Sequence, residues 1–69
     1  MKNETNLARI RKLRGYTQEE LARRAGISVV SIRNWEQGKR KVKGASFEHV
    51  CDLAFALDCD PFELIEVEE

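Results

Sequence analysis

Residues 18–37 read QEELARRAGISVVSIRNWEQ, and this stretch decides how the chain folds. Two runs with helical spacing of apolar residues lie on either side of a three-residue joint, Gly26-Ile27-Ser28. Glycine accepts the positive φ that turns a chain after a helix, and a joint this short sets two helices at a steep angle. We therefore expect two closely crossing helices over about residues 17–37. The outer face of the second helix should project from the domain as a ridge.

Small and apolar side chains occur where such a pair of helices needs them. Ala22 is small at the expected crossing, and Ile27 and Ile32 are apolar where the second helix packs back. Trp35 shares a helical face with Ile32, so we expect it in the core rather than as a platform for stacking. A ridge of this shape fits the major groove of DNA, while the N-terminus of the first helix meets phosphates.

Three further helices are expected around this pair. Leu7, Ile10 and Leu13 stand at three-residue steps, which predicts a helix over about residues 6–14. Polar residues that can cap a helix N-terminus mark the starts of the two helices of the pair and of the two helices that follow it. They are Thr17, Ser28, Ser46 and Asp60.

The C-terminal part of the chain is expected to hold two of these helices. The first, over about residues 46–57, has an apolar stripe at helical spacing: Phe47, Val50, Cys51, Ala54 and Leu57. A short second helix starts at Asp60-Pro61, since proline suits the first helical position. Its apolar contacts would come from Phe62, Leu64 and Ile65. No segment alternates with a period of two, so the sequence predicts an all-α fold, one domain of five helices over residues 1–69.

The charges are divided unequally along the chain. The 69 residues include 12 Lys and Arg and 12 Asp and Glu, for a formal net charge of zero. Residues 1–43, however, hold all 12 bases and four acids, a balance of +8, whereas residues 44–69 hold eight acids and no Lys or Arg. Such an asymmetry is typical of a protein that binds a polyanion at one end.

Composition argues against several other classes of protein. The longest apolar run, residues 53–57, is too short to cross a membrane, and the polar N-terminus does not predict a signal peptide. Cys51 and Cys59 match no disulfide framework and no CxxC metal motif, so we expect reduced thiols in a cytoplasmic protein. His49 and Cys51 are two residues apart on a helix and point to opposite sides. We expect neither an enzyme nor a bound cofactor or metal.

The order of these motifs resembles the helix-turn-helix family of Cro and phage repressors, also called Xre-type. The likeness extends over about residues 6–65, nearly the whole chain. It is carried by Leu7, Ile10, Arg11, Arg14, Tyr16-Thr17-Gln18-Glu19-Glu20-Leu21-Ala22, Gly26-Ile27-Ser28, Ser31-Ile32, Trp35-Glu36-Gln37-Gly38, Leu53-Ala54, Ala56-Leu57 and Leu64. The resemblance implies a compact five-helix, lambda-repressor-like DNA-binding domain with its helix-turn-helix at about residues 17–37.

The resemblance also implies roles for individual residues. The positions that face base edges are Val29, Val30, Asn34 and, at the margin, Arg33. Contacts with the DNA backbone are expected from Gln18 and Ser28 and, at the edge of the base-facing set, from Ser31. Structural roles fall to Arg11, Ala22, Gly26, Ile32, Trp35 and Glu36. Among these, Arg11 matches the family arginine that pairs with Glu36, and Gln18 matches the residue that binds a phosphate and braces the base-reading helix.

Two departures from the family pattern bear on how DNA would be recognised. The loop after Gly38 looks three or four residues longer than usual, lacks the common proline and contains four bases: Lys39, Arg40, Lys41 and Lys43. Because they flank the base-reading helix, we interpret them as phosphate contacts, with a solvated turn as the alternative. Val29 and Val30 can touch a thymine methyl group but cannot form a bidentate pair. Specificity should then rest more on Asn34, Arg33 and DNA shape.

These features favour sequence-specific binding of double-stranded DNA by a repressor-like transcriptional regulator, with a homodimer covering two half-sites. The alternative is an antitoxin or adaptor that keeps the fold and docks a protein partner through the acidic segment at about residues 60–69. Glu66, Glu68 and Glu69 would otherwise be an exposed tail that adds solubility. Arg23 and Arg24 fit equally well as phosphate contacts or as a solvated helix face.

Overall fold

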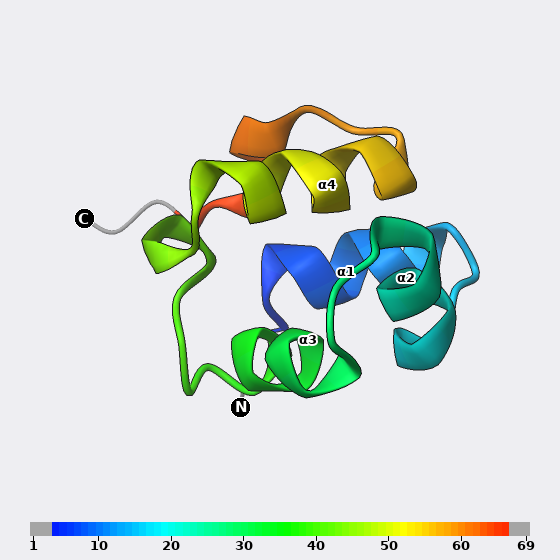
Figure 1. Cartoon of the computed structure of the whole chain (residues 1–69), viewed down its shortest axis with the longest axis horizontal. Helices are drawn as coiled ribbons and strands as arrows, with labels where there is room; N and C mark the ends of the chain where they lie inside the picture. Colours follow the sequence, from blue (N-terminus) through cyan, green and yellow to red (C-terminus); the bar gives the residue numbers. More distant parts are fainter. Residues whose placement is uncertain (1–3, 67–69) are drawn as a thin grey trace.

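The computed structural model describes residues 4–66, and every regular element within that range is helical. The α-helices are α1 (Asn6–Leu13), α2 (Gln18–Ala25), α3 (Val29–Glu36) and α4 (Phe47–Leu57), and two 3₁₀ turns are η1 (Val42–Gly44) and η2 (Pro61–Leu64). In Figure 1, α4 and η2 lie on one side of the molecule and α3 on the other, with α1 and α2 between them. The all-α prediction is therefore confirmed for the described residues.

The count of five helices is not confirmed, because the short helix expected after Asp60 is a single 3₁₀ turn. Its start is as predicted: Asp60 and Glu63 form a reciprocal capping box around Pro61. The turn then ends at Ile65, whose extended backbone leaves the helical region. This exit lets Leu64 point into the core with its side chain fully buried, and it lets the chain turn back toward α1.

Local chemistry sets most of the other helix ends. Thr17, Ser28 and Ser46 each accept a backbone N–H through the side-chain hydroxyl, which confirms them as N-caps. Gly26 ends α2 in the left-handed region at φ 70°, where a Cβ would be strained. The end of α4 has no such glycine. Asp58 takes φ 54° there, and the guanidinium of Arg14 donates to the carbonyl oxygens of Leu57 and Asp58 at 2.6 and 3.2 Å.

The core is built from one face of each helix. Its fully buried side chains are Leu7, Leu21, Ile32, Leu53, Leu57 and Leu64. Trp35 and Ile27 are also buried, as predicted. Val42 joins them from the middle of the basic loop and is only 2% exposed. The loop is therefore anchored to the core by its one large apolar residue.

Three apolar side chains that were expected to face inward are exposed. Leu13 lies 120° around the helix from Leu7, because two three-residue steps each fall 60° short of a full turn. Phe47 is the first residue of α4, and the core reaches that helix only from Val50 onward. Phe62 lies on the outer side of η2, since Leu64 occupies the inner side.

The two ends of the described chain meet. A carboxylate oxygen of Glu66 accepts a hydrogen bond of 2.5 Å from the backbone N–H of Asn6, at the start of α1, and the Asn6 amide donates to the carbonyl of Ile65. Glu66 is half-buried rather than part of an exposed tail. Glu68 and Glu69 lie outside the described residues. Within residues 4–66, no helix is long and apolar enough to cross a membrane.

Candidate nucleic-acid interface

The turn between α2 and α3 fixes the direction of α3. The backbone N–H of Ile27 donates to the carbonyl of Ala22 at 3.0 Å, and the Ile27 side chain is buried against the core. Gly26 supplies the left-handed residue that reverses the chain. The outcome is the steep helix pair expected from the sequence, with α3 along one side of the molecule (Figure 1).

The inner and outer faces of α3 separate cleanly. Ile32 and Trp35 are buried. Val30 and Arg33 are exposed on the outer side, while Val29, Ser31 and Asn34 are half-buried. All of the expected base-facing residues are thus at least partly accessible. Val30, more than half exposed, presents an apolar surface to solvent on this helix.

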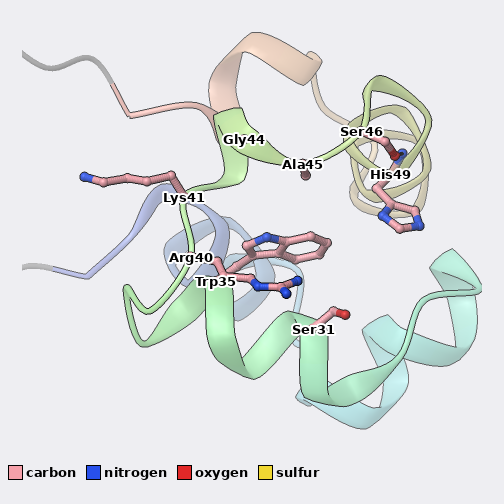
Figure 2. Close-up of a pocket in the computed structure, with 8 residues that line it drawn as sticks. All are labelled: Ser31, Trp35, Arg40, Lys41, Gly44, Ala45, Ser46 and His49. Atoms are coloured by element: carbon pink, nitrogen blue, oxygen red, sulfur yellow. Dashed lines mark hydrogen bonds between the residues drawn. The ribbon is translucent and has the colours of Figure 1, made fainter.

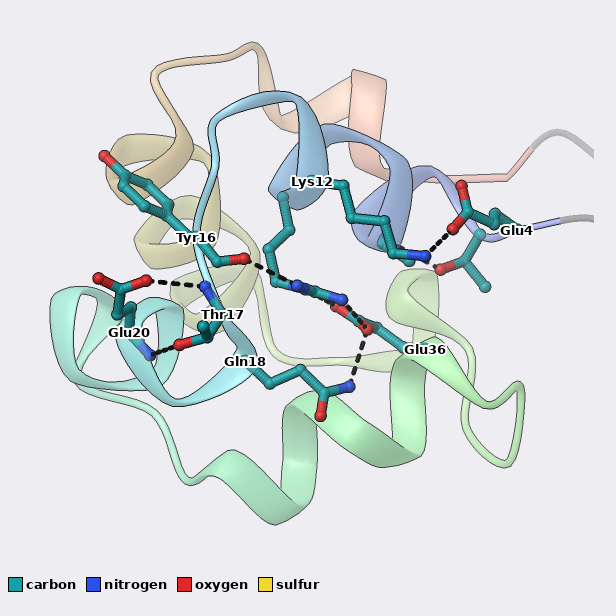
Figure 3. A network of polar contacts seen from close by, with 10 residues as sticks. Glu4, Lys12, Tyr16, Thr17, Gln18, Glu20 and Glu36 are labelled. Carbon is teal, nitrogen blue, oxygen red and sulfur yellow. Dashed lines mark hydrogen bonds and ion pairs between the residues drawn. The ribbon is translucent and has the colours of Figure 1, made fainter.

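A polar network holds the end of α3 against α1 and the start of α2. The guanidinium of Arg11 donates to both carboxylate oxygens of Glu36, at 2.7 and 3.0 Å, and to the carbonyl of Tyr16 at 2.8 Å. The side-chain amide of Gln18 donates to Glu36 at 2.9 Å, a contact visible in Figure 3. Both expected contacts, Arg11 with Glu36 and Gln18 with the end of α3, are present.

This network lies largely out of water. The side chains of Arg11 and Glu36 are only 11% and 6% exposed. The hydrogen bond to Glu36 raises the pKa of the Arg11 guanidinium, against the opposing effect of burial. A doubly bonded, buried pair fixes direction as well as distance, so α3 is held at a defined angle to α1.

The capping box of α2 gives the domain a second fixed point near this face. The Thr17 backbone N–H donates to a carboxylate oxygen of Glu20, and the Glu20 N–H donates to the Thr17 hydroxyl (Figure 3). The hydrogen bond from Thr17 lowers the pKa of the Glu20 carboxyl. The N-terminus of α2, with Gln18 as its first residue, is therefore well ordered.

Arg33 is already paired in the structure. Its guanidinium donates to Glu19 of α2 at 3.0 Å, and both side chains are largely exposed. Exposed pairs of this kind contribute little to stability, so the contact is easily exchanged for another acceptor. Sequence reasoning missed this partner because the two residues are brought together only by the turn between the helices.

The basic loop contributes to two different surfaces. Arg40 and Lys41 line an open pocket of about 620 Å³ beside α3, together with Ser31, Trp35, Ser46 and His49 (Figure 2). Lys43 lines a separate, apolar pocket near Phe47 and Phe62. Lys39 is exposed and lines neither. The four bases are therefore not one cluster.

Two polar residues of this pocket, Ser46 and His49, were not among the expected contacts. His49 packs edge-on against Trp35, with ring centroids 6.1 Å apart, and Ser46 caps α4 at the mouth of the pocket. The sequence did contain a signal for both residues. Ser46 is a predicted N-cap, and His49, three positions later, lies in the same exposed first turn of the helix. What it lacked was the path of the loop that brings this turn beside α3.

Arg24 is in contact with an aromatic side chain. The guanidinium of Arg24 lies over the Tyr16 ring, 4.5 Å from its centroid, a geometry that favours a cation–π contact. Tyr16 is half-buried at the edge of the core. Both arginines are exposed on α2.

Comparison with known proteins agrees with this geometry. A helix-turn-helix family model matches residues 7–64, and the chain belongs to the Cro/C1-type helix-turn-helix family of DNA-binding transcriptional regulators. Among solved structures it is similar to the restriction-modification controller protein C.AhdI from Aeromonas hydrophila, with 33% sequence identity and a TM-score of 0.77. That match covers 87% of this chain and 86% of the controller protein. A search of curated protein sequences found no match.

Proposed function

We propose that this protein is a sequence-specific regulator that binds double-stranded DNA by placing α3 in the major groove, and that it acts as a repressor. The observation that carries the proposal is the outer face of α3, which is accessible along its length and is flanked by the basic pocket of Arg40 and Lys41. An α-helix fits the major groove, and cations beside it contact phosphates.

Base recognition would come from four residues of α3. Val29 and Val30 are suited to thymine methyl groups, and Asn34 to an adenine edge. Arg33 would exchange Glu19 for a guanine or a phosphate, which costs little because the existing pair is solvated. Because two of the four proposed base-facing residues are valines, they would form few hydrogen bonds with bases. DNA shape would therefore supply part of the specificity.

Phosphate contacts would fix the register of α3 in the groove. The proposed set is Gln18, Ser28, Ser31, Lys39, Arg40, Lys41 and Lys43. We add Ser46 and His49 to this proposal because they line the same pocket as Arg40. Gln18 supports this role because Glu36 orients its side chain at the start of α2. A phosphate bound there would also meet the N-terminus of a helix.

We propose that two copies of the chain bind one regulatory site. One copy reads a half-site, whereas a dimer covers two half-sites about 34 Å apart. The likeness to a restriction-modification controller protein supports a regulatory role. The alternative of docking a protein partner through the acidic C-terminal segment has less support, because Glu66 is engaged with Asn6.

Selection of bound sites from a random duplex pool, followed by salt titration of the selected site, tests this function. A shared motif with twofold symmetry is expected. With ~5 phosphate contacts per copy, log K for each bound copy should fall with log salt at a slope on the order of −4 to −5. A pool that yields no motif, or an affinity that does not respond to salt, would contradict the proposal.

A further inference from the structure

His49 is the only histidine of the chain, and the fold leaves it exposed in the first turn of α4. Histidine is the side chain whose ordinary pKa places its change of charge between pH 5 and pH 8. The surroundings of this one ring therefore decide whether the chain can sense pH in that range through a histidine.

The His49 ring stands at the wall of the open pocket beside α3 (Figure 2). It packs edge-on against Trp35, which is only 4% exposed, so one side of the ring rests on the core. The two loop cations, Arg40 and Lys41, line the same pocket. Among residues 4–66, no acidic side chain lines it. The pocket therefore combines an ionisable ring with two fixed positive charges.

The polar groups of this pocket suit an anion. The Ser46 hydroxyl accepts the backbone N–H of His49 at 3.2 Å, and it still has a proton of its own to donate. Ser46 is also the N-cap of α4, a helix of 11 residues, whose positive end favours negative charge. Ser31 of α3 lines the pocket as well. With α3 in the major groove, the anion beside it would be a phosphate of the DNA backbone.

Other charged groups lie on the elements packed around His49. They are Glu48 and Asp52 of α4 itself and Arg23 and Arg24 of α2, besides Arg40 and Lys41 of the loop. The acids of η2, Asp60 and Glu63, close their own capping box instead. Of all these groups, only the two loop cations line the pocket. Neighbouring cations disfavour a charged imidazolium, whereas a neighbouring anion favours it. A bound phosphate would supply the negative charge that the pocket lacks.

We propose that His49 binds a DNA phosphate in its protonated form, so that each copy of the chain takes up a proton from solvent as it binds. No covalent bond changes in this step, because the neutral imidazole becomes an imidazolium beside the phosphate. The inference rests on the proposed function and deepens it, since it makes the affinity for DNA depend on pH. Binding is tighter in mildly acidic solution and weaker above neutrality.

Fluorescence anisotropy on the selected duplex, at pH 6, 7 and 8 and at one ionic strength, measures this dependence. The affinity of each bound copy should fall about fivefold from pH 6 to pH 8. This is the change expected when one imidazole holds its proton about tenfold more tightly in the complex than in the free protein.

Two exchanges at the same position separate charge from shape. His49→Gln is uncharged throughout the range, so it should bind at pH 6 as weakly as the wild type does at pH 8. His49→Arg is charged throughout the range, so it should bind at pH 8 as tightly as the wild type does at pH 6. Both variants should be insensitive to pH. Circular dichroism at each pH checks that they are folded.

Calorimetry provides a second readout that needs no variant. Titration of DNA into the wild-type chain in two buffers with different heats of ionisation counts the protons taken up. About half a proton per bound copy is expected near pH 7, and no uptake would contradict the inference.

Three other results would also overturn it. Wild-type affinity could be equal at pH 6 and pH 8, or the pH dependence could persist in His49→Gln. Equal weakening of the Gln and Arg variants at every pH would show that His49 only packs against Trp35. A chain that binds no duplex at any pH would overturn the proposed function as well, so the two failures are distinguishable.

Discussion

Arg11 and Glu36, 25 residues apart in sequence, form a buried ion pair joined by two hydrogen bonds of 2.7 and 3.0 Å. The pair connects the last turn of α1 to the last residue of α3. Because Gln18 donates to the same carboxylate, one acidic side chain fixes three helices. The orientation of α3, the proposed base-reading helix, therefore depends on a buried contact outside the proposed base-facing residues.

Glu36→Ala should lower the free energy of unfolding by about 3–5 kcal/mol, because it leaves the Arg11 charge buried without its partner. Urea denaturation at neutral pH measures the loss. The control is Lys12→Ala, which breaks the exposed ion pair with Glu4 and should cost less than about 1 kcal/mol. The double exchange Arg11→Met/Glu36→Leu should recover most of the stability; equal losses in the single and double variants would show that burial of the pair is not what matters.

Gln18→Ala should lower stability by about 1 kcal/mol, the usual net value of one hydrogen bond. It should also weaken binding to every DNA sequence alike. Since glutamine carries no charge, its removal releases no counterions, and the slope of log K against log salt should stay the same. A changed slope would mean that Gln18 acts by moving charged contacts and not by binding a phosphate itself.

Lys41→Ala should differ from Gln18→Ala in the salt dependence of binding. It should weaken binding uniformly and reduce the magnitude of the salt slope by about 1, as expected for one lost phosphate contact. Fluorescence anisotropy on the selected site and on a scrambled duplex, at four or more salt concentrations, measures both effects. A shift in the preferred sequence would place Lys41 among the base-reading residues instead.

Asn34→Ala should alter specificity and leave the salt slope unchanged. The loss should be about 1–3 kcal/mol at a single base step of the selected site, with little change on scrambled DNA. Repeating the site selection with the variant shows which step is affected. An unchanged selected motif would remove Asn34 from the base-reading set.

Glu20→Gln should reduce stability in a pH-dependent way. The folded state lowers the pKa of Glu20 below its ordinary value of 4.5, so its carboxylate contributes stability above that pH and loses it as the pH falls below. The variant should therefore be less stable than the wild type at pH 7, with the gap closing on acidification. Glu19→Gln, which removes a charge from the same helical turn outside the capping box, should show a smaller gap in parallel urea titrations.

Local signals in the sequence were sufficient for much of the fold. Thr17, Ser28 and Ser46 cap helices as predicted, and Gly26 turns the chain, because each acts through its own backbone neighbours. The contact between Arg11 and Glu36 was reached differently, through a resemblance, since nothing in the spacing of those two residues requires it.

Long-range packing determines which of several apolar side chains are buried and which distant residues meet, and local sequence patterns do not predict either. Val42 stands between basic residues in a charged loop, yet its side chain is buried because the loop packs it into the core. Phe47 and Phe62 fit apolar stripes, yet they are exposed because Val50 and Leu64 take the inner positions. Arg33 meets Glu19, and His49 reaches the pocket beside α3, only through the paths of the connecting segments.

The contact of Glu66 with Asn6 has a consequence for how the protein is made. Among the described elements α1 is synthesised before the others, but the protein acceptor for its first backbone N–H arrives 60 residues later. Closing a contact of such large sequence separation costs loop-closure entropy, which the packing of the intervening chain must offset. Until Glu66 has emerged from the ribosome, water would accept the hydrogen bond from that N–H, and the protein acceptor would replace it only when the two ends of the described chain meet.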